Sequence, residues 1–557
     1  MLERSALLPK SLQCLKDYSR ATLASDLIAG VTVGLVALPL AMAFAISSGV
    51  PPQTGLYCAI VAGFIISALG GSKTQIGGPT GAFVVVVAGI VAKYGIDGLF
   101  LCTILAGIIL ILLGITGLGS AVKYIPRPVV VGFTNGIAVL IASTQIKDFF
   151  GLQIDKVPGE FLGRMESIAM HWHTLSWHST ATACVALLTI IFMTRFVKRV
   201  PGSIVALFAG TGIAWIFTLP LETISTRFGG IPQGLPSFSV PTLNWSHVLQ
   251  LASPALTVAM LGAIESLLSA VVSDRMSGDK HNPNVELFAQ GVANVTVPFF
   301  GGLPATGAIA RTATNIRSGA KTPVAGMVHA LTLLVVLVFA APLAGHIPLC
   351  ILAAILLVVS YNMGEWHEIP EILKLSKADI AVWAISFGLT VFADLTVAVE
   401  AGMILAALMY IRKVTFTTTV AFVTPEYVKA GMAHSLQTNS IPEGAVVIRI
   451  HGPFLFGSTD KLSVVDEVFD TLPPVVILRL RNMTAIDATG LVALENLAER
   501  LRKSGRHLVT CGMRDQPAQL MSQAHFHRLI GSENIVGSLE AAIARARVLL
   551  AVSENIA

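Results

Sequence analysis

Residues 77–82 read GGPTGA, and residues 301–308 read GGLPATGA. Each stretch interrupts a long hydrophobic region and leads directly into sequence with helical character. Gly and Pro break a membrane-spanning helix, and broken segments at corresponding places in two halves of a membrane chain point to a site for a small solute. A single stretch of this kind would be explained by a kink in a packed helix. The matched pair favours a binding site.

The composition indicates a polytopic membrane protein. Of the 557 residues, 54% are hydrophobic and 12% are charged, and the mean hydropathy is +0.75. A soluble enzyme of ordinary surface composition is less apolar than this. The net charge of +5 is spread along the chain without a basic run, so nothing points to nucleic acid. No GxSxG, Walker or HExxH pattern occurs, and we therefore do not expect an enzyme.

The cysteine and histidine patterns give no reason to expect a metal or another cofactor. The six cysteines lie far apart and form no CxxC pair, which argues against a structural metal or a disulfide framework. His171 and His173 form an HxH beside Trp172, in a long loop between two hydrophobic segments. An interfacial position for this loop is favoured over metal binding. We predict no metal and no cofactor.

Fourteen hydrophobic segments are long enough to span or half-span a bilayer. They centre near Leu35, Ile60, Val86, Ile109, Gly136, Leu188, Ala209, Met260, Ala293, Ala313, Val335, Ala354, Ile385 and Ala407. With this count, Lys and Arg concentrate in the loops on the side of the N-terminus, which supports fourteen spans with both ends in the cytoplasm. We expect a multi-pass protein of the plasma membrane, which in a bacterium is the inner membrane.

The character of the chain changes near residue 443. Short β-type runs at residues 446–450 and 475–480 are followed or separated by helix-like stretches such as residues 491–503, a pattern typical of a soluble α/β domain. The predicted parts are a cytoplasmic N-terminus at 1–20, a transmembrane domain at 21–413, a linker at 414–442, the soluble domain at 443–550 and a tail at 551–557.

The two glycine-rich stretches predict a pair of half-helices. Thr follows the helix-breaking residues in each, and Thr is a favourable N-cap, so we predict that Thr80 and Thr306 cap the helices that follow. About ten residues follow each cap before the next polar loop, which is half a bilayer at about 1.5 Å per residue. The topology directs the first half-helix outward and the second inward, so that their N-termini face each other. Unpaired N–H groups and the positive end of each helix dipole suit an anion.

Arg311 follows a little over one turn into the second half-helix. A cation near the middle of a bilayer costs at least about 2.5–3.5 kcal/mol on insertion scales, which makes it a functional candidate. We predict that Arg311 adds positive potential to the anion site. The alternative is that its side chain extends into a cytoplasmic vestibule.

Glu265 lies in an apolar stretch, residues 259–269, where a carboxylate has no routine structural purpose. A Glu265 beside Arg311 would be ionised in the empty site and take up a proton when an anion arrives, which would couple the two. The alternative is a fixed ion pair with Arg311 that never titrates. Ser269, one turn on, shares the face of Glu265 and would complete a polar pocket or an alternative cation site.

Several motifs resemble the sulfate permease (SulP) family of anion transporters. They are DLIAG at 26–30 leading to Pro39, GLY at 55–57, GGPTGA at 77–82, HNPN at 281–284 and QG at 290–291. The C-terminal part is similar to a STAS domain (sulfate transporter and anti-sigma-factor antagonist). The resemblance implies two inverted repeats of seven segments, sorted into a core domain and a gate domain, and it implies a homodimer.

The resemblance also implies which residues hold the anion and couple its transport. The substrate positions at the starts of the third and tenth spans match Thr80, Gly81, Ala82 and Phe83, together with Gly307, Ala308 and Ile309. Arg311 matches a basic position of sulfate-transporting members. Glu265 matches an acidic position on the eighth span that is Asp in sodium-coupled members, so the longer Glu favours a proton as the coupling ion.

In the C-terminal domain, IDATG at residues 486–490 resembles the loop that anti-sigma-factor antagonists phosphorylate. Ala488 stands where their phosphoserine follows the Asp, so that switch is excluded here. Asp487 and Thr489 remain weak regulatory candidates, and the simpler interpretation is that one of them caps the next helix. The domain is expected to serve trafficking, assembly or regulation through a cytoplasmic partner.

The leading functional hypothesis is proton-coupled uptake of sulfate by alternating access. A C4-dicarboxylate carried with protons is the second hypothesis. Sodium-coupled bicarbonate uptake, with Glu265 and Ser269 holding the cation, is the third. A hypothesis of a different class is a membrane-anchored signalling protein whose output is the C-terminal domain.

Overall fold

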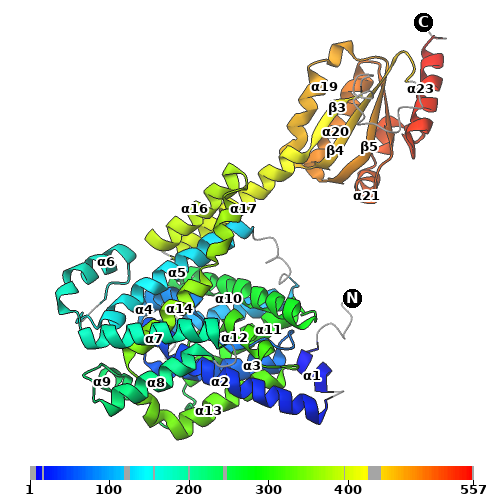
Figure 1. Cartoon of the computed structure of the whole chain (residues 1–557). Helices are drawn as coiled ribbons and strands as arrows, with labels where there is room; N and C mark the ends of the chain where they lie inside the picture. The colour runs from blue at the N-terminus through cyan, green and yellow to red at the C-terminus, as the bar shows by residue number, and fades with distance from the viewer. Residues whose placement is uncertain are drawn as a thin grey trace. The chain divides into compact units, whose positions relative to one another are not determined.

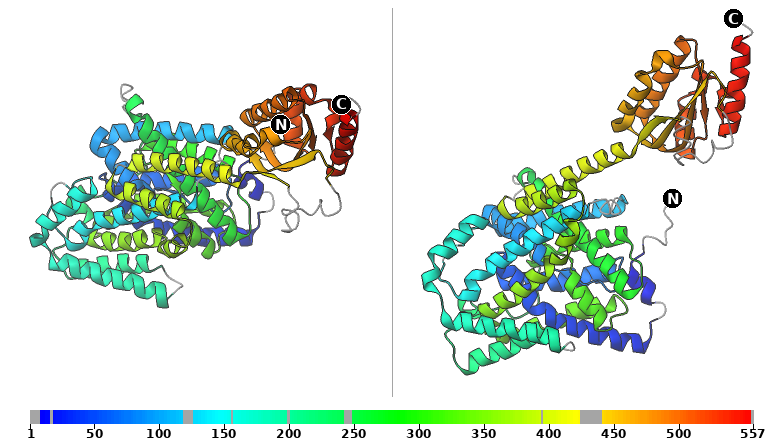
Figure 2. Two further views of the ribbon diagram at one scale, coloured as in Figure 1. Left: turned by 90° about the horizontal axis from the view of Figure 1, so that it is seen from above. Right: turned by 45° about the horizontal axis from the view of Figure 1, so that its top comes forward.

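The computed structural model describes residues 8–15, 18–117, 126–154, 157–197, 201–241, 248–393, 395–423 and 441–554. The chain divides into two compact units, residues 1–406 and 407–557, and each is described by itself (Figure 1). The first unit is helical, and its helices run side by side as one bundle (Figure 2). The second contains a sheet with helices on both faces.

In the part of the chain that the structure describes, seventeen labelled helices, α1 to α17, make up the bundle, and the boundary between the two units falls inside α17. Their bounds are α1 (Lys10–Cys14), α2 (Arg20–Ser47), α3 (Pro52–Leu69), α4 (Gly81–Ile115), α5 (Arg127–Phe150), α6 (Phe161–Met170), α7 (Trp177–Phe196), α8 (Gly202–Ile216), α9 (Ile224–Phe228), α10 (Val248–Ser277), α11 (Pro283–Thr296), α12 (Ile309–Arg317), α13 (Val324–Gly345), α14 (Leu349–Met363), α15 (Ile369–Ile372), α16 (Lys377–Phe392) and α17 (Leu395–Thr417).

Each of the fourteen predicted segment centres falls on one of these helices. Two of the centres lie on α4, one on each side of Gly95. The φ of 70° at Gly95 interrupts the helical backbone, so α4 consists of two helical parts. Within the described ranges, eight helices are long and apolar enough to cross a membrane, and α8 is a shorter apolar helix. Helices α11 and α12 have 14 and 9 residues, so the segments near the second glycine-rich stretch are too short to span alone.

A buried carboxylate joins α2 to the turn before α13. Asp26 is fully buried, and its Oδ1 accepts from the backbone N–H groups of Lys321 (2.7 Å) and Thr322 (3.2 Å). Its Oδ2 accepts from the hydroxyls of Thr322 (2.5 Å) and Tyr18 (3.1 Å). Four donors compensate for the desolvation of this charge, and they fix α2 against α13.

The second unit holds a five-stranded sheet in the order β3-β4-β5-β6-β7. The strands are β3 (Thr419–Phe422), β4 (Ala445–Phe454), β5 (Val475–Ile486), β6 (His507–Cys511) and β7 (Ile535–Val536). Only the β3–β4 pair is antiparallel. β3 lies inside the segment predicted as a linker, and residues 424–440 of that segment lie outside the described residues.

Helices cover both faces of this sheet because β5 alternates two apolar sets. Val476, Leu478 and Leu480 pack in one cluster with the apolar face of α20 (Ala488–Lys503). Val475 and Ile477 pack in another cluster with α23 (Leu539–Glu554). The shorter helices are α19 (Ser463–Asp466), α21 (Asp515–Gln523) and α22 (His527–Ile530).

Candidate functional site

The structure brings the two glycine-rich stretches together as a two-stranded antiparallel ladder. Strand β1 (Gly77–Gly78) pairs with β2 (Thr306–Gly307), with Gly77 opposite Gly307 and Gly78 opposite Thr306. Helix α4 begins three residues after β1, and α12 begins two residues after β2. The starts of both helices therefore lie beside the same short ladder.

The predicted caps behave differently from each other. Thr80 is the N-cap residue of α4, but its hydroxyl makes no capping hydrogen bond. The N-cap residue of α12 is Ala308, so the prediction that Thr306 caps this helix is wrong. Pairing in β2 keeps Thr306 extended, and its hydroxyl instead bonds Ser266 Oγ (2.7 Å) and donates to the carbonyl of Gly262 (3.0 Å). Thr306 therefore fastens the ladder to α10.

The start of α4 offers polar groups without partners. The hydroxyl of Thr80 is buried and has no hydrogen-bond partner among the described residues. The N–H of Phe83 donates to the carbonyl of Thr80 (3.2 Å), while the N–H groups of Gly81 and Ala82 precede the first helical bond. These two amides and the Thr80 hydroxyl are available to a bound anion.

At the start of α12, two of the predicted donors already have partners. The N–H of Gly307 donates to Ser266 Oγ (3.1 Å), and the N–H of Ala308 donates to the carbonyl of Ile76 (2.8 Å). The orphan amides of the first helical turn therefore begin at Ile309. Gly307 and Ala308 therefore shape the site through their own hydrogen bonds. The N–H groups available at the start of α12 belong to Ile309 and the residues that follow it.

Arg311 reaches from α12 across to the other stretch. Its Nη2 donates to the carbonyl of Pro79, and its Nη1 is buried without a partner in the described part of the chain. A Cβ on Gly78 would lie 2.8 Å from Nη1, so the guanidinium rests directly against the backbone of β1. Arg311 is only 2% exposed, which excludes the alternative of a side chain extended into solvent.

Glu265 lies on α10 and is 8% exposed. Over the ranges that the structure covers, neither Glu265 nor Arg311 takes part in an ion pair within 4.0 Å, so the structure does not contain the fixed pair considered above. Ser269 is buried, and its Oγ lies 3.1 Å from Thr312 Oγ1, which in turn accepts from the N–H of Ile76 (3.0 Å). Ser269 thus belongs to the scaffold that connects α10, α12 and β1.

Several polar residues that the sequence analysis missed position the ladder. Asn294 holds the residue before β2 through two bonds of 2.8 Å, one to and one from the backbone of Ala305. Asn315 Nδ2 donates to the carbonyl of Thr74 (2.9 Å). Gln75 Nε2 donates to the carbonyl of Ser266 (3.1 Å). The signal that could have identified Asn294 is the one that identified Glu265, namely a polar residue in an apolar membrane segment. Gln75 and Asn315 lie in polar stretches, which carry no such signal.

In the second unit, Asp487 caps α20. Its Oδ1 accepts from the N–H of Gly490 (2.8 Å), and its Oδ2 accepts from the N–H of Phe456 (2.9 Å). The simpler interpretation of this loop, a helix cap, is confirmed. Thr489 is exposed in the first turn of the helix, and a regulatory role for either residue stays a prediction.

Comparison with known proteins follows the same division of the chain. The sequence model of the sulfate permease family matches residues 23–386, and that of the STAS domain matches residues 437–542. The chain belongs to the sulfate permease family. It is 40% identical to the putative sulfate transporter YvdB of Bacillus subtilis over 93% of this chain and 97% of that protein.

Two solved structures are similar to this chain in fold. The transmembrane domain of the bicarbonate transporter BicA from a cyanobacterium is 32% identical, covers 70% of this chain and 98% of its own, and gives a TM-score of 0.62. The murine anion transporter Slc26a9 in its inward-facing state gives a TM-score of 0.85 at 18% identity over 98% of this chain and 94% of its own. The predicted fold class, a helical membrane transporter with a C-terminal STAS domain, is confirmed. The protein is an anion transporter and not an enzyme.

Proposed function

We propose that this transporter carries a divalent oxyanion, sulfate first and a C4-dicarboxylate second, into the cell together with protons by alternating access. The observation that carries the proposal is Arg311, a buried cation held against the ladder between the starts of α4 and α12. Each helix N-terminus carries about half a positive charge, so two of them and one guanidinium sum to about two positive charges, which suits a divalent anion. The similarity to a putative sulfate transporter supports sulfate as the first candidate.

Proton coupling is assigned to Glu265. A buried carboxylate without an ion-pair partner is costly, and protonation removes that cost. Glu265 directly precedes Ser266, whose hydroxyl accepts the N–H of Gly307 and bonds the hydroxyl of Thr306. Protonation of Glu265 therefore changes the charge next to Ser266, the residue that hydrogen-bonds the second glycine-rich stretch. Coupling acts through this short connection between α10 and β2.

Uptake of radiolabelled sulfate into proteoliposomes tests the proposal. An inwardly directed proton gradient should accelerate uptake, and Glu265→Gln should abolish that acceleration while leaving sulfate exchange measurable. Unlabelled fumarate or succinate that competes more strongly than sulfate would move the substrate to the dicarboxylates. Uptake that ignores the gradient, or an unchanged pH dependence in Glu265→Gln, would contradict proton coupling.

Sodium-coupled bicarbonate transport is the second candidate, favoured by the likeness to the bicarbonate transporter BicA. The carboxylate of Glu265 and the hydroxyl of Ser269, one turn apart on α10, are the oxygen groups that would hold the cation. Replacing sodium with choline in the same assay separates this candidate from the first. Deletion of residues 440–557 tests the signalling hypothesis. That hypothesis requires that the membrane part has no transport activity, so anion uptake by the truncated protein would contradict it.

A further inference from the structure

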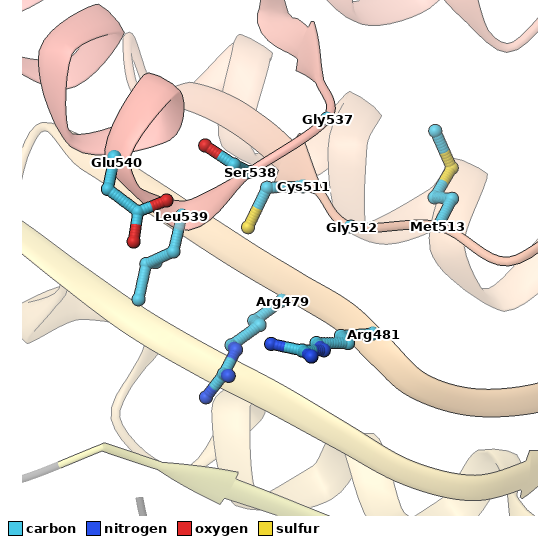
Figure 3. Close-up of a pocket in the computed structure, with 9 residues that line it drawn as sticks. All are labelled: Arg479, Arg481, Cys511, Gly512, Met513, Gly537, Ser538, Leu539 and Glu540. Carbon is cyan, nitrogen blue, oxygen red and sulfur yellow. The ribbon is translucent and has the colours of Figure 1, made fainter. Parts of the chain in front are cut away.

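The STAS domain contains a cavity of about 300 Å³ at the carboxyl end of its parallel strands (Figure 3). Its volume is at the lower end of the range for small-molecule pockets. Residues from β5, the end of β6 and the start of α23 line it, and most of its surface is polar. They are Arg479, Arg481, Cys511, Gly512, Met513, Gly537, Ser538, Leu539 and Glu540.

The cavity forms where α23 stops covering the sheet. On one face of β5, Val475 and Ile477 are buried against α23. The next two residues of that face, Arg479 and Arg481, lie beyond the first turn of the helix. The face thus changes from apolar to cationic at the point where its cover ends. Figure 3 shows the two arginine side chains next to each other, with Cys511 and Ser538 on the segments that face them.

The charges of the lining favour an anion. Two guanidinium groups line the cavity against one carboxylate, that of Glu540. A third arginine, Arg514, donates through Nε to the carbonyl of Arg481 (2.9 Å) and adds positive charge close by. Burial raises the pKa of Cys511 to about 11, so its thiol is neutral at pH 7 and contributes no negative charge.

The start of α23 adds backbone donors to the arginines. Ser538 caps this helix, since its Oγ accepts from the N–H of Ala541 (3.2 Å). Leu539 is one of the lining residues, and its N–H group precedes the first helical bond. The strands, the arginines and the helix start converge on one space, as in the anion sites at the carboxyl edge of other parallel sheets.

We propose that this cavity binds a small tetrahedral oxyanion, with Arg479 and Arg481 as its principal ligands. Free phosphate, free sulfate and the phosphate group of a nucleotide share this chemistry. Two guanidinium groups with planar donors can bind such an oxyanion through charge-assisted hydrogen bonds. The site lies in the STAS domain and does not depend on the function proposed for the membrane unit.

Hydrogen exchange of the purified full-length protein, followed by mass spectrometry, tests this proposal at the site itself. Inorganic phosphate, sulfate and AMP are added separately at millimolar concentrations. At least one should slow exchange in the peptide around residues 534–545. Arg481→Gln should weaken the apparent affinity by about tenfold, the loss expected for one charge-assisted hydrogen bond. The double variant Arg479→Gln/Arg481→Gln should abolish the protection.

Two controls make the outcome specific. Arg502→Gln removes the same charge from an exposed position on α20, and Arg311→Gln alters the proposed transport site; both should leave the protection unchanged. Unaltered exchange in α20 confirms that the arginine variants are folded. Protection by AMP alone identifies a nucleotide site, whereas equal protection by phosphate or sulfate identifies a site for the free ion. Absence of protection by all three, or full protection in the double variant, overturns the proposal.

Discussion

Arg311 donates from Nη2 to the carbonyl oxygen of Pro79, so a cation on α12 is bound to the residue immediately before the N-cap of α4. The two stretches are thereby joined twice, once by the β1–β2 ladder and once by this side chain. Because one guanidinium nitrogen, Nη1, keeps no partner in the described part of the chain, Arg311 combines a structural bond with a group available for a ligand. This dual use makes its substitution informative.

Replacement of Arg311 should separate charge from geometry. Arg311→Gln removes the positive charge, and we expect sulfate uptake at subsaturating substrate to fall by about 30-fold or more, the effect of losing a bond of about 2 kcal/mol to a charged group. Arg311→Lys keeps the charge but cannot bind Pro79 and an anion with a planar fork, so partial activity is expected. Initial rates in proteoliposomes measure both.

The control for this experiment is Arg317→Gln at the exposed end of the same helix. It removes an equal charge from α12 without touching the ladder, and its uptake should match that of the unmodified protein. Equal losses in Arg311→Gln and Arg317→Gln would mean that α12 needs net positive charge and that Arg311 has no specific role.

The sequence alone predicted the membrane class, a soluble α/β domain, which the family resemblance identified as a STAS domain, and the two stretches that the structure pairs. These follow from local signals: hydropathy over about 20 residues, β-type runs, and Gly and Pro at breaks. All fourteen segment centres lie on helices for the same reason. The break at Gly95 shows how a single glycine divides a helical run that hydropathy reads as two segments.

The partners of individual groups could not be predicted, because they depend on contacts between residues far apart in the chain. Thr306 has the local sequence of a cap, but the pairing of β2 with β1 holds it in a strand. Gly307 and Ala308 look like free helix amides, yet Ser266 and Ile76 accept their N–H groups. Glu265 and Arg311 look complementary in charge, but no local pattern fixes the distance between α10 and α12.

Gly307 should tolerate no side chain. A Cβ there would lie 1.8 Å from Gln75 Nε2 and 3.1 Å from the Cα of Ser266. We expect Gly307→Ala to lower the free energy of unfolding by about 1–3 kcal/mol through overpacking and to impair transport. The double variant Gly307→Ala/Gln75→Ala removes the first clash and should recover part of the lost stability. Thermal unfolding in detergent measures both, and a Gly307→Ala protein as stable as the original would contradict the close packing.

The position of α1 should depend on pH in the acid range. Asp279 bonds both Lys10 (3.1 Å) and Lys73 (3.2 Å). Burial alone would raise the pKa of this carboxyl, but bonds from the backbone of Lys280 and from Lys10 and Lys73 outweigh burial and lower it. The stabilisation is therefore present above the ordinary pKa of an aspartate and is lost as pH falls through the lower, folded value.

Asp279→Asn measures this contribution. The variant should be slightly less stable than the unmodified protein at pH 7, by up to about 1 kcal/mol because the pair is partly exposed. The difference should shrink as pH falls below the ordinary aspartate pKa of about 3.9, because the folded pKa lies lower still. Glu371→Gln breaks the exposed Glu371–Lys374 pair and serves as the control, with no measurable change expected. A difference for Asp279→Asn that stays constant as pH falls from 7 to well below the ordinary aspartate pKa of about 3.9 would rule out the ionic origin.

Asp26 should be the most sensitive carboxylate outside the site. Asp26→Ala leaves the buried N–H of Thr322 and the partly buried N–H of Lys321 without acceptors, which is expected to cost about 3–5 kcal/mol and to separate α2 from the start of α13. Asp26→Asn keeps one acceptor oxygen but places an amide donor against the hydroxyls of Thr322 and Tyr18, so an intermediate loss is expected. Asp97→Ala, at an exposed position, should leave the unfolding temperature unchanged. A variant that folds normally but loses transport would show that this link between α2 and the start of α13 is needed for transport as well as for stability.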